Sequence, residues 1–149
     1  MSADGPRDHR RSDGTSEWEL VSAKARYCRL LDTKDWPALA DMLAENVTVD
    51  LDAGNPASVL LVGRESVIAA LQAGVEGART VHQVHLPEIS IDGDVADVVW
   101  PVQERVIWSN GTSLTAFGHY RDTWRRERDR WLLEAMRLSH LLMEFSSED

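Results

Sequence analysis

Four polar side chains in this sequence stand where packing does not require them, and their types suit proton transfer in an apolar cavity. Tyr27 and Asp32 lie in the stretch 25–36, which joins two predicted helices. Glu104 and His140 are each a single polar residue in a strand row that is otherwise apolar. A carboxylate or imidazole in such a row costs free energy unless it is paired. We therefore expect these residues, with a further histidine, to converge on one cavity.

Each of these residues also has a purely structural interpretation. Tyr27 can fill the interface between helix and sheet, and Asp32 can be a turn residue that binds nearby backbone. Glu104 can meet solvent in a half-exposed strand, and His140 can be a hydrogen-bonded core histidine. From the residues alone, both interpretations stay open.

Two histidines, His82 and His85, lie three residues apart in a predicted strand. Side chains alternate along a strand, so an odd spacing directs the two imidazoles to opposite faces. This weakens the His-x-x-His pattern as a metal-binding pair, and no metal site is expected.

The bulk properties narrow the class of protein. The 149 residues are most simply a single domain over 15–149, preceded by a polar, charged arm over 1–14 that is expected to be disordered. The net charge of −9 argues against nucleic-acid binding, which needs a cationic surface. A single cysteine, the absence of a signal-peptide pattern and the absence of a long apolar stretch predict a cytoplasmic protein that does not enter membranes.

The first half of the chain predicts three helices. The first covers 16–31. The second follows a turn at 32–35, where Asp35 can cap it and Pro37 lies in its first turn. Its apolar face repeats at helical spacing from Trp36 to Leu43. The third covers 64–73 and stops at Gly74.

The second half changes to a strand period. Short strands are expected at 47–51 and 59–62. Four long β runs follow, over 80–91, 95–108, 113–125 and 131–145. Asn-Gly at 110–111 is a strong hairpin signal, and Asp-Gly-Asp at 92–94 and a charged run near 127–129 separate the other runs. The pattern predicts an α+β fold in which helices cover one face of an antiparallel meander and leave a pocket between the layers.

Several apolar and polar residues are expected to line that pocket, although its tryptophans can equally be core. In the run 113–125 we expect Phe117 and His119 on the pocket side, and in the last run Leu138, His140 and Leu142. The candidate substrate-contacting residues are Trp36, Trp100, Val102, Trp108, Phe117, His119, Leu138 and His140.

Two segments carry a resemblance to a known family. Ala-Arg-Tyr-Cys-Arg-Leu-Leu-Asp-Thr-Lys-Asp-Trp at 25–36 and Val-His-Gln-Val-His-Leu-Pro-Glu-Ile at 81–89 resemble SnoaL-like proteins of the nuclear-transport-factor-2-like superfamily. Enzyme relatives there include scytalone dehydratase, bile-acid 7α-dehydratase and ketosteroid isomerase. The resemblance covers about 18–145. It implies a cone-shaped α+β barrel, with three helices capping a curved, mostly antiparallel sheet around one deep apolar cavity.

The resemblance also implies roles for individual residues. Tyr27, Asp32 and His82 match a tyrosine, aspartate and histidine that act together in the dehydratases, and Glu104 falls at an acidic position of the next strand. His82 would then transfer protons, Asp32 would orient it, and Tyr27 would stabilise an oxygen that gains charge. His140 falls where many relatives have an arginine, a departure that bears on recognition of an anionic substrate group. This chemistry requires no cofactor.

The function implied is a cofactor-free dehydratase acting on a hydrophobic cyclic substrate such as a polyketide or steroid. An isomerase or cyclase using the same base, a non-catalytic binding module and a scaffold role are the alternatives. Because relatives associate through the sheet, a homodimer or homotrimer is expected.

One geometric condition attaches to Tyr27 and Asp32. They are five residues apart, which is roughly 140° around an ideal helix. Both can face one cavity only if the first helix ends or unwinds before Asp32, and the turn residues at 32–35 favour such an end.

Overall fold

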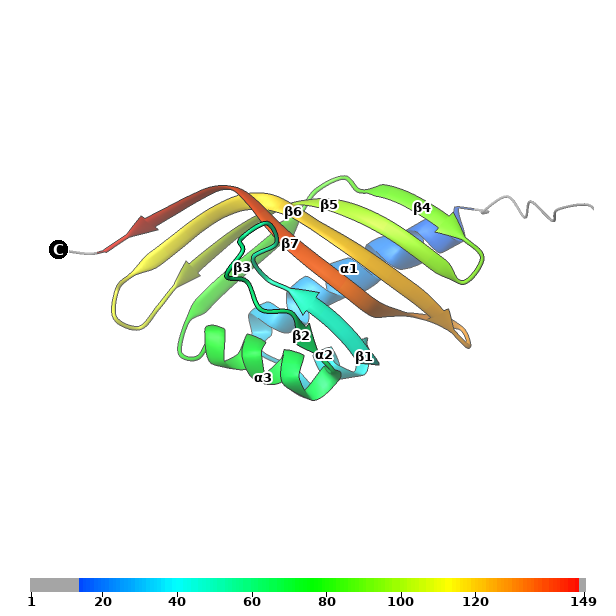
Figure 1. Ribbon diagram of the computed structural model, residues 1–149, viewed down its shortest axis with the longest axis horizontal. Coiled ribbons are helices and arrows are strands. Elements are labelled where there is room, and N and C mark those ends of the chain that lie inside the picture. Colours follow the sequence, from blue (N-terminus) through cyan, green and yellow to red (C-terminus); the bar gives the residue numbers. More distant parts are fainter. Residues whose placement is uncertain (1–13, 148–149) are drawn as a thin grey trace, which may run out of the picture.

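Three helices cover one face of a curved sheet in the computed structural model, which describes residues 14–147 (Figure 1). The described residues form a seven-stranded sheet, and its strand order, β2-β1-β7-β6-β5-β3 with β4 also on β5, leaves it open. This confirms the predicted α+β class, with a curved open sheet in place of a closed barrel. The predicted arm over 1–14 lies outside the described residues except for Gly14, which caps the first helix.

The helices are α1 (Thr15–Thr33), α2 (Trp36–Asp41) and α3 (Arg64–Gly74). The predicted cap of α2 is present, because the Asp35 carboxylate accepts a hydrogen bond from the backbone N–H of Ala38 at 3.2 Å. Leu43, predicted to extend the apolar face of this helix, instead begins β1 (Leu43–Asp50). Its side chain is still fully buried in the core.

Helix α1 continues through Asp32, so the expectation that it ends before this residue is wrong. Lys34 closes the helix in the left-handed conformation, with φ of 59°. Asp32 therefore projects from the last helical turn, about 140° from Tyr27. Asp32 is not part of the cavity wall that contains Tyr27. Its hydrogen-bond partner, His82, lies on the edge strand of the sheet.

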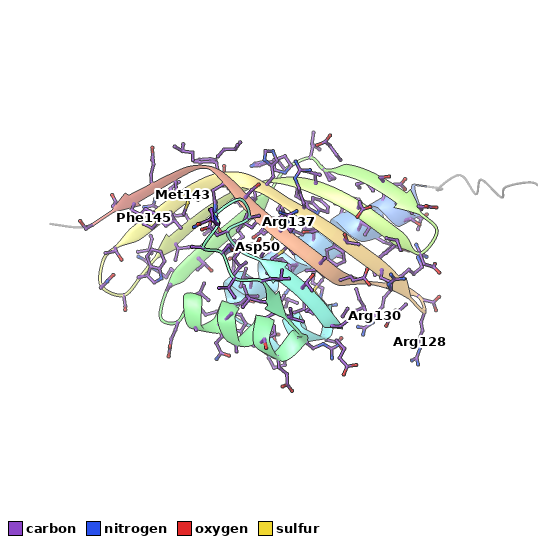
Figure 2. All side chains as sticks on the ribbon, in the orientation of Figure 1. Asp50, Arg128, Arg130, Arg137, Met143 and Phe145 are labelled. Atoms are coloured by element: carbon purple, nitrogen blue, oxygen red, sulfur yellow. The ribbon has the colours of Figure 1, made fainter. Side chains whose placement is uncertain are left out.

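The sheet is built around a meander of three long strands, β5 (Val95–Ile107), β6 (Ser113–Glu127) and β7 (Arg130–Ser146). These pair antiparallel, whereas β1 pairs parallel to β7 and antiparallel to β2 (Leu61–Val62). Figure 2 shows Arg128 and Arg130 at the β6–β7 turn, where Arg128 has a φ of 57°. The charged run thus forms the predicted hairpin tip.

The predicted strand over 80–91 is two strands, β3 (Arg79–Val84) and β4 (Glu88–Asp92). Both pair antiparallel with β5. The break falls at Leu86 and Pro87. A proline has no N–H for the ladder, so the chain leaves the sheet there and rejoins it at Glu88.

The face of β6 that packs on the helices is the opposite of the one predicted. Tyr120 and Asp122 are buried on the inner face, whereas the Phe117 side chain is 41% exposed and His119 lies on the outer side with it. Phe117 and His119 are therefore not cavity residues. Alternation defines two rows along a strand but does not say which one is inside.

A β-bulge in β7 changes the alternation near His140. Phe117 pairs with Leu142 and Gly118 pairs with His140, so Leu141 is an extra residue on β7. Leu138 and His140 keep the inner face, but Leu142 moves to the outer face and is 49% exposed. The prediction that Leu142 faces the cavity is therefore wrong, because a bulge shifts every later residue by one.

Gly118 is the residue that makes this bulge possible. A Cβ at Gly118 would lie 1.9 Å from the backbone oxygen of Ser139, so β7 can approach only a glycine. We expect Gly118→Ala to lower the free energy of unfolding by about 3 kcal/mol or more. Urea unfolding measures this. Gly74→Ala is the matched control, because a Cβ there meets nothing within 4 Å; equal destabilisation of the two variants would contradict the prediction.

Candidate active site

His82 and Glu104 are directly opposite each other on β3 and β5. The neighbouring backbone bond from His85 to Pro101 shows that the His82–Glu104 position is a non-hydrogen-bonded pair of the ladder, in which side chains lie closest. The His82 Nε2 atom is 3.2 Å from Glu104 Oε2. The strand register thus creates this contact.

Asp32 holds the other side of the His82 ring. Its Oδ1 lies 2.6 Å from His82 Nδ1 and accepts the Thr80 hydroxyl at 3.0 Å, and its Oδ2 accepts the His82 backbone N–H at 2.9 Å. This N–H points away from β5 because the pair is non-hydrogen-bonded, and it is available to Asp32 because β3 is an edge strand. With three protein donors, the carboxylate is fixed against the histidine although it projects from the end of a helix.

Glu104 also reaches His140, which lies two strands away on β7. Its Oε1 atom is 2.7 Å from His140 Nε2. The residues of β6 between them on the inner face are Ala116 and Gly118, which are small enough for the longer side chains to meet above them. Asp32, His82, Glu104 and His140 therefore form one continuous hydrogen-bonded row.

A cavity of about 160 Å³ lies beside this row, between the helices and the sheet. His82 and Glu104 form the polar part of its wall, together with the rings of Tyr27 and Tyr120. The two tyrosine rings meet edge to face, with their centroids 6.3 Å apart. The remaining lining is apolar or backbone, from Leu31, Leu51, Ala70, Leu71, Gly74, Val75, Val106 and Leu138.

The two carboxylates determine the charge of the histidine between them. Burial by itself lowers the pKa of His82, but the hydrogen bonds and negative charges of Asp32 and Glu104 outweigh it and raise the pKa to about 9. Burial raises the pKa of Glu104, but bonds from His140 and His82 outweigh it and lower the pKa to about 2. At neutral pH the resting row therefore holds an imidazolium between two carboxylates.

The tyrosines behave differently from the charged row. Burial raises the pKa of both Tyr27 and Tyr120 well above the usual value of a phenol. Both hydroxyls therefore stay protonated at neutral pH. In the cavity wall they can act as hydrogen-bond donors.

The predicted site residues divide into three groups. Tyr27, His82, Glu104 and Leu138 line the cavity, and Asp32 and His140 lie behind them in the polar row. The predicted contacts that do not line it are Trp36, Trp100, Val102, Trp108, Phe117 and His119.

The four of these that lie on the inner side have packing roles. Trp100 and Val102 are buried in the main core, and Trp36 packs against it. Trp108 packs beside the smaller cluster that includes Val106 and donates its indole N–H to the Gly74 carbonyl at 3.3 Å. Trp100, Val102 and Trp108 were predicted as substrate contacts because they share a strand face, but the cavity spans only part of that face, and Trp36 lies on α2.

Sequence reasoning missed Tyr120 and Thr80. Thr80 is two residues before His82 and shares its side of β3, so alternation could have found it. Tyr120 was missed because the opposite row of β6, with Phe117 and His119, was predicted to face the pocket, although the row of Tyr120 also contains Leu114 and Trp124.

Three further findings concern the described chain. No helix within residues 14–147 is long and apolar enough to cross a membrane. His82 is buried and His85 is exposed, as the odd spacing predicted. In the same part of the chain, no group of three or more potential metal ligands is arranged to hold an ion.

The fold is similar to that of an NTF2-like protein with a cystatin-like fold from Novosphingobium aromaticivorans, with a TM-score of 0.71 at 20% identity, covering 85% of this chain and 82% of its own. A family model described as the SnoaL-like domain matches residues 13–137, and the chain belongs to the SnoaL-like family. A curated relative, "Probable cyclase FGR4" from Gibberella zeae, is 25% identical over 137 residues, covering 83% of this chain and 90% of its own.

Solved structures show the same fold at low sequence identity. A candidate scytalone dehydratase from Novosphingobium aromaticivorans has a TM-score of 0.79 at 17% identity, with 87% of each chain covered. The Kfla4162 protein from Kribbella flavida has a TM-score of 0.78 at 23% identity and covers 87% of this chain and 93% of its own. A hexachlorocyclohexane dehydrochlorinase (LinA) of type 2 has a TM-score of 0.77 at 11% identity, with 91% of each chain covered.

Proposed function

We propose that this protein is a cofactor-free acid–base enzyme, a lyase that removes water from a small cyclic hydroxy-ketone. The observation that carries the proposal is the position of His82, which is held between Asp32 and Glu104 in the wall of an apolar cavity. A histidine with one fixed ring nitrogen and one ring nitrogen toward a cavity is the arrangement used for proton transfer.

The proposed reaction begins at His82 Nε2. Asp32 Oδ1 lies 2.6 Å from His82 Nδ1 and accepts a hydrogen bond from it. Neutral His82 therefore keeps its proton on Nδ1 and has a free electron pair on Nε2. This nitrogen takes a proton from the carbon next to the substrate carbonyl, and Tyr27 donates a hydrogen bond to the oxygen that gains charge. The C–O bond of the neighbouring hydroxyl then breaks, the C=C bond forms, and the imidazolium returns its proton to the leaving oxygen. The products are an enone and water.

Glu104 and His140 complete the proposed machinery. The Glu104 carboxylate contacts both imidazoles, at 3.2 Å and 2.7 Å, and stabilises the positive charge that His82 carries as an imidazolium. Hydrogen bonding to Glu104 is the main reason that the pKa of His140 is raised, so His140 keeps this carboxylate charged and oriented. Incoming substrate would displace Glu104 from Nε2 and expose the base.

The size of the cavity narrows the proposed substrate. A dry cavity of about 150 Å³ in another protein accommodates benzene. The 160 Å³ beside His82 therefore suits one six-membered ring with its substituents. A four-ring steroid would need the helices to move away from the sheet, so a single-ring compound is the better candidate.

A cyclase or isomerase using the same base is the second candidate. The curated relative named as a cyclase favours it, because enolate formation is common to ring closure, double-bond migration and dehydration. The three reactions differ only in what the enolate does next.

Association through the outer face of the sheet, as a dimer or trimer, stays a prediction.

The test uses single-ring probes. We expect β-hydroxycyclohexanone to lose one water and give the conjugated cyclohexenone, followed by ultraviolet absorbance and mass spectrometry. The unconjugated cyclohexenone tests isomerisation, because its conversion keeps the molecular formula. A hydroxylated two-ring ketone and a hydroxylated steroid serve as size controls and are expected to react more slowly. A preference for the steroid would contradict the size argument, and water loss that persists in His82→Ala would contradict the mechanism.

A further inference from the structure

A buried ion pair lies behind the two tyrosines of the cavity, between α1 and β6. Lys24 Nζ is 2.9 Å from Asp122 Oδ2, and both side chains are completely inaccessible to solvent. The indole N–H of Trp124 donates to the same Asp122 oxygen at 3.2 Å, and the Met136 sulfur is 3.7 Å from the ammonium. Neither charged residue lines the cavity, and the proposed reaction does not use them.

Stability alone does not explain this pair. Removing two charges from water costs several kcal/mol per ion in real proteins, and apolar residues of similar volume often serve equally well. Burial raises the pKa of Asp122, with Lys24 opposing that effect, so the carboxylate depends on the ammonium. The position of the Lys24 charge relative to its other neighbours therefore matters.

Those neighbours are the aromatic rings of the cavity wall. The Lys24 ammonium lies 3.7 Å from the ring centroid of Tyr120 and 4.6 Å from that of Tyr27. Both distances are within the range of cation–π attraction, which is strongest when the cation is desolvated. A cation at these distances attracts both rings and restrains them relative to each other, and by polarising the rings it would make the phenol hydroxyls better hydrogen-bond donors.

We propose that Lys24, held by Asp122, is a positioning residue that makes Tyr120 a second hydroxyl donor beside Tyr27 for a substrate oxygen that gains negative charge. The inference rests on the proposed function, because it assigns an oxyanion to this cavity. It differs from the mechanism above, in which Tyr27 is the sole donor. Two donors on one oxygen are the usual form of such a site.

The test measures binding without turnover, so that it can succeed or fail independently of the proposed reaction. The probe is para-nitrophenolate, a single-ring oxyanion whose ionisation is read from its absorbance. Nitrobenzene, which has the same ring without the oxyanion, is the neutral reference. We expect the wild-type protein to bind the phenolate at least 10-fold more tightly than nitrobenzene, because hydrogen bonds to a charged oxygen are the stronger class.

Two variants separate the roles. Tyr120→Phe is expected to weaken phenolate binding by about 10-fold and leave nitrobenzene binding unchanged. Lys24→Met combined with Asp122→Asn removes the buried pair without changing net charge and keeps an acceptor for Trp124. It is expected to stay folded, since paired removal avoids a lone buried charge, and to weaken phenolate binding by about 5-fold or more.

The matched control removes an exposed ion pair in the same way. Arg130 and Asp41 are 2.9 Å apart at the surface, and Arg130→Met with Asp41→Asn is expected to change neither affinity. Phenolate binding no tighter than nitrobenzene binding, or unchanged in Tyr120→Phe, would overturn the assignment of Tyr120. An unchanged phenolate affinity in the folded Lys24 double variant would overturn the role of Lys24. If the probes behave as expected but no ketone is dehydrated, the proposed reaction fails and the oxyanion site stands.

Discussion

Replacing His82 with alanine is expected to lower kcat for dehydration of the hydroxy-ketone by about 10³-fold. This factor lies in the middle of the range that a general base typically contributes. Among residues 14–147 no other imidazole lines the cavity, and His140 lies beyond Glu104. Replacing Asp32 with asparagine should have a similar effect. An amide that donates to Nδ1 would favour the tautomer with the proton on Nε2, where the base must be free.

The matched control for His82→Ala is His85→Ala. His85 is three residues away, is exposed and lies on the opposite side of the strand. Its replacement is expected to leave kcat unchanged. Both variants should have the circular dichroism spectrum of the wild type. Activity in His82→Ala within 10-fold of wild type would reject His82 as the base.

Asp32→Asn also has a readout that needs no substrate. The carboxylate is one of the two anions that raise the pKa of His82 to about 9. Removing its charge is expected to lower that pKa by one unit or more, which nuclear magnetic resonance of the imidazole can follow. An unchanged titration of His82 would show that Asp32 is not its partner in solution.

The second large effect concerns the pH dependence of the rate. His82 must be neutral to accept a proton, and its pKa in the folded protein is about 9. The neutral form is therefore scarce at neutral pH, and kcat/KM is expected to rise with pH and level off above about 9. This rise reports the loss of the His82 proton from the free enzyme.

Glu104→Gln is expected to change this profile in two ways. It removes the second anion from His82, so the rise should move down by one pH unit or more. The plateau at high pH should fall by about 10²-fold, because no carboxylate remains beside Nε2 to stabilise the imidazolium that forms when His82 takes the substrate proton. A complete pH profile separates the shift in the pH of the rise from the loss of plateau rate. A single measurement at neutral pH would not distinguish the two.

His140→Gln is the companion variant. Glutamine can still donate one hydrogen bond to Glu104, so the carboxylate keeps a partner although it loses a cationic one. We expect a plateau within about 10-fold of wild type and a small shift of the rise. A fall as large as that of Glu104→Gln would mean that His140 takes part directly in proton transfer. An unshifted profile in Glu104→Gln would mean that Glu104 does not control the charge of His82.

Local sequence patterns determined much of the fold. The strand runs of β5, β6 and β7 followed from alternation and hairpin signals, and the cap at Asp35 followed from local turn chemistry. The helix–sheet plan then followed, because three amphipathic helices and a meander have one efficient way to bury their apolar faces. The residues of the polar row were also visible in the sequence, since each interrupts an apolar pattern or matches the family resemblance.

The tertiary structure decided how those residues meet. The register of β3 on β5 placed His82 opposite Glu104, and two small residues of β6 allowed Glu104 to reach His140. Asp32 contacts His82 although it is part of a helix, because the edge strand directs both the ring and the backbone N–H of His82 toward it. Such contacts depend on long-range pairing, which local patterns do not encode.

The tertiary structure also decided which side of β6 is inside. Alternation gave two rows, and the row that was predicted to be inside, with Phe117, lies outside. The bulge at Leu141 and the glycine opposite it redirected the end of β7. Only the packed helices and sheet placed Tyr120 in the cavity and Lys24 behind it. A strand has two equivalent faces until something packs on one of them, and this is why the cavity wall could not be read from the sequence.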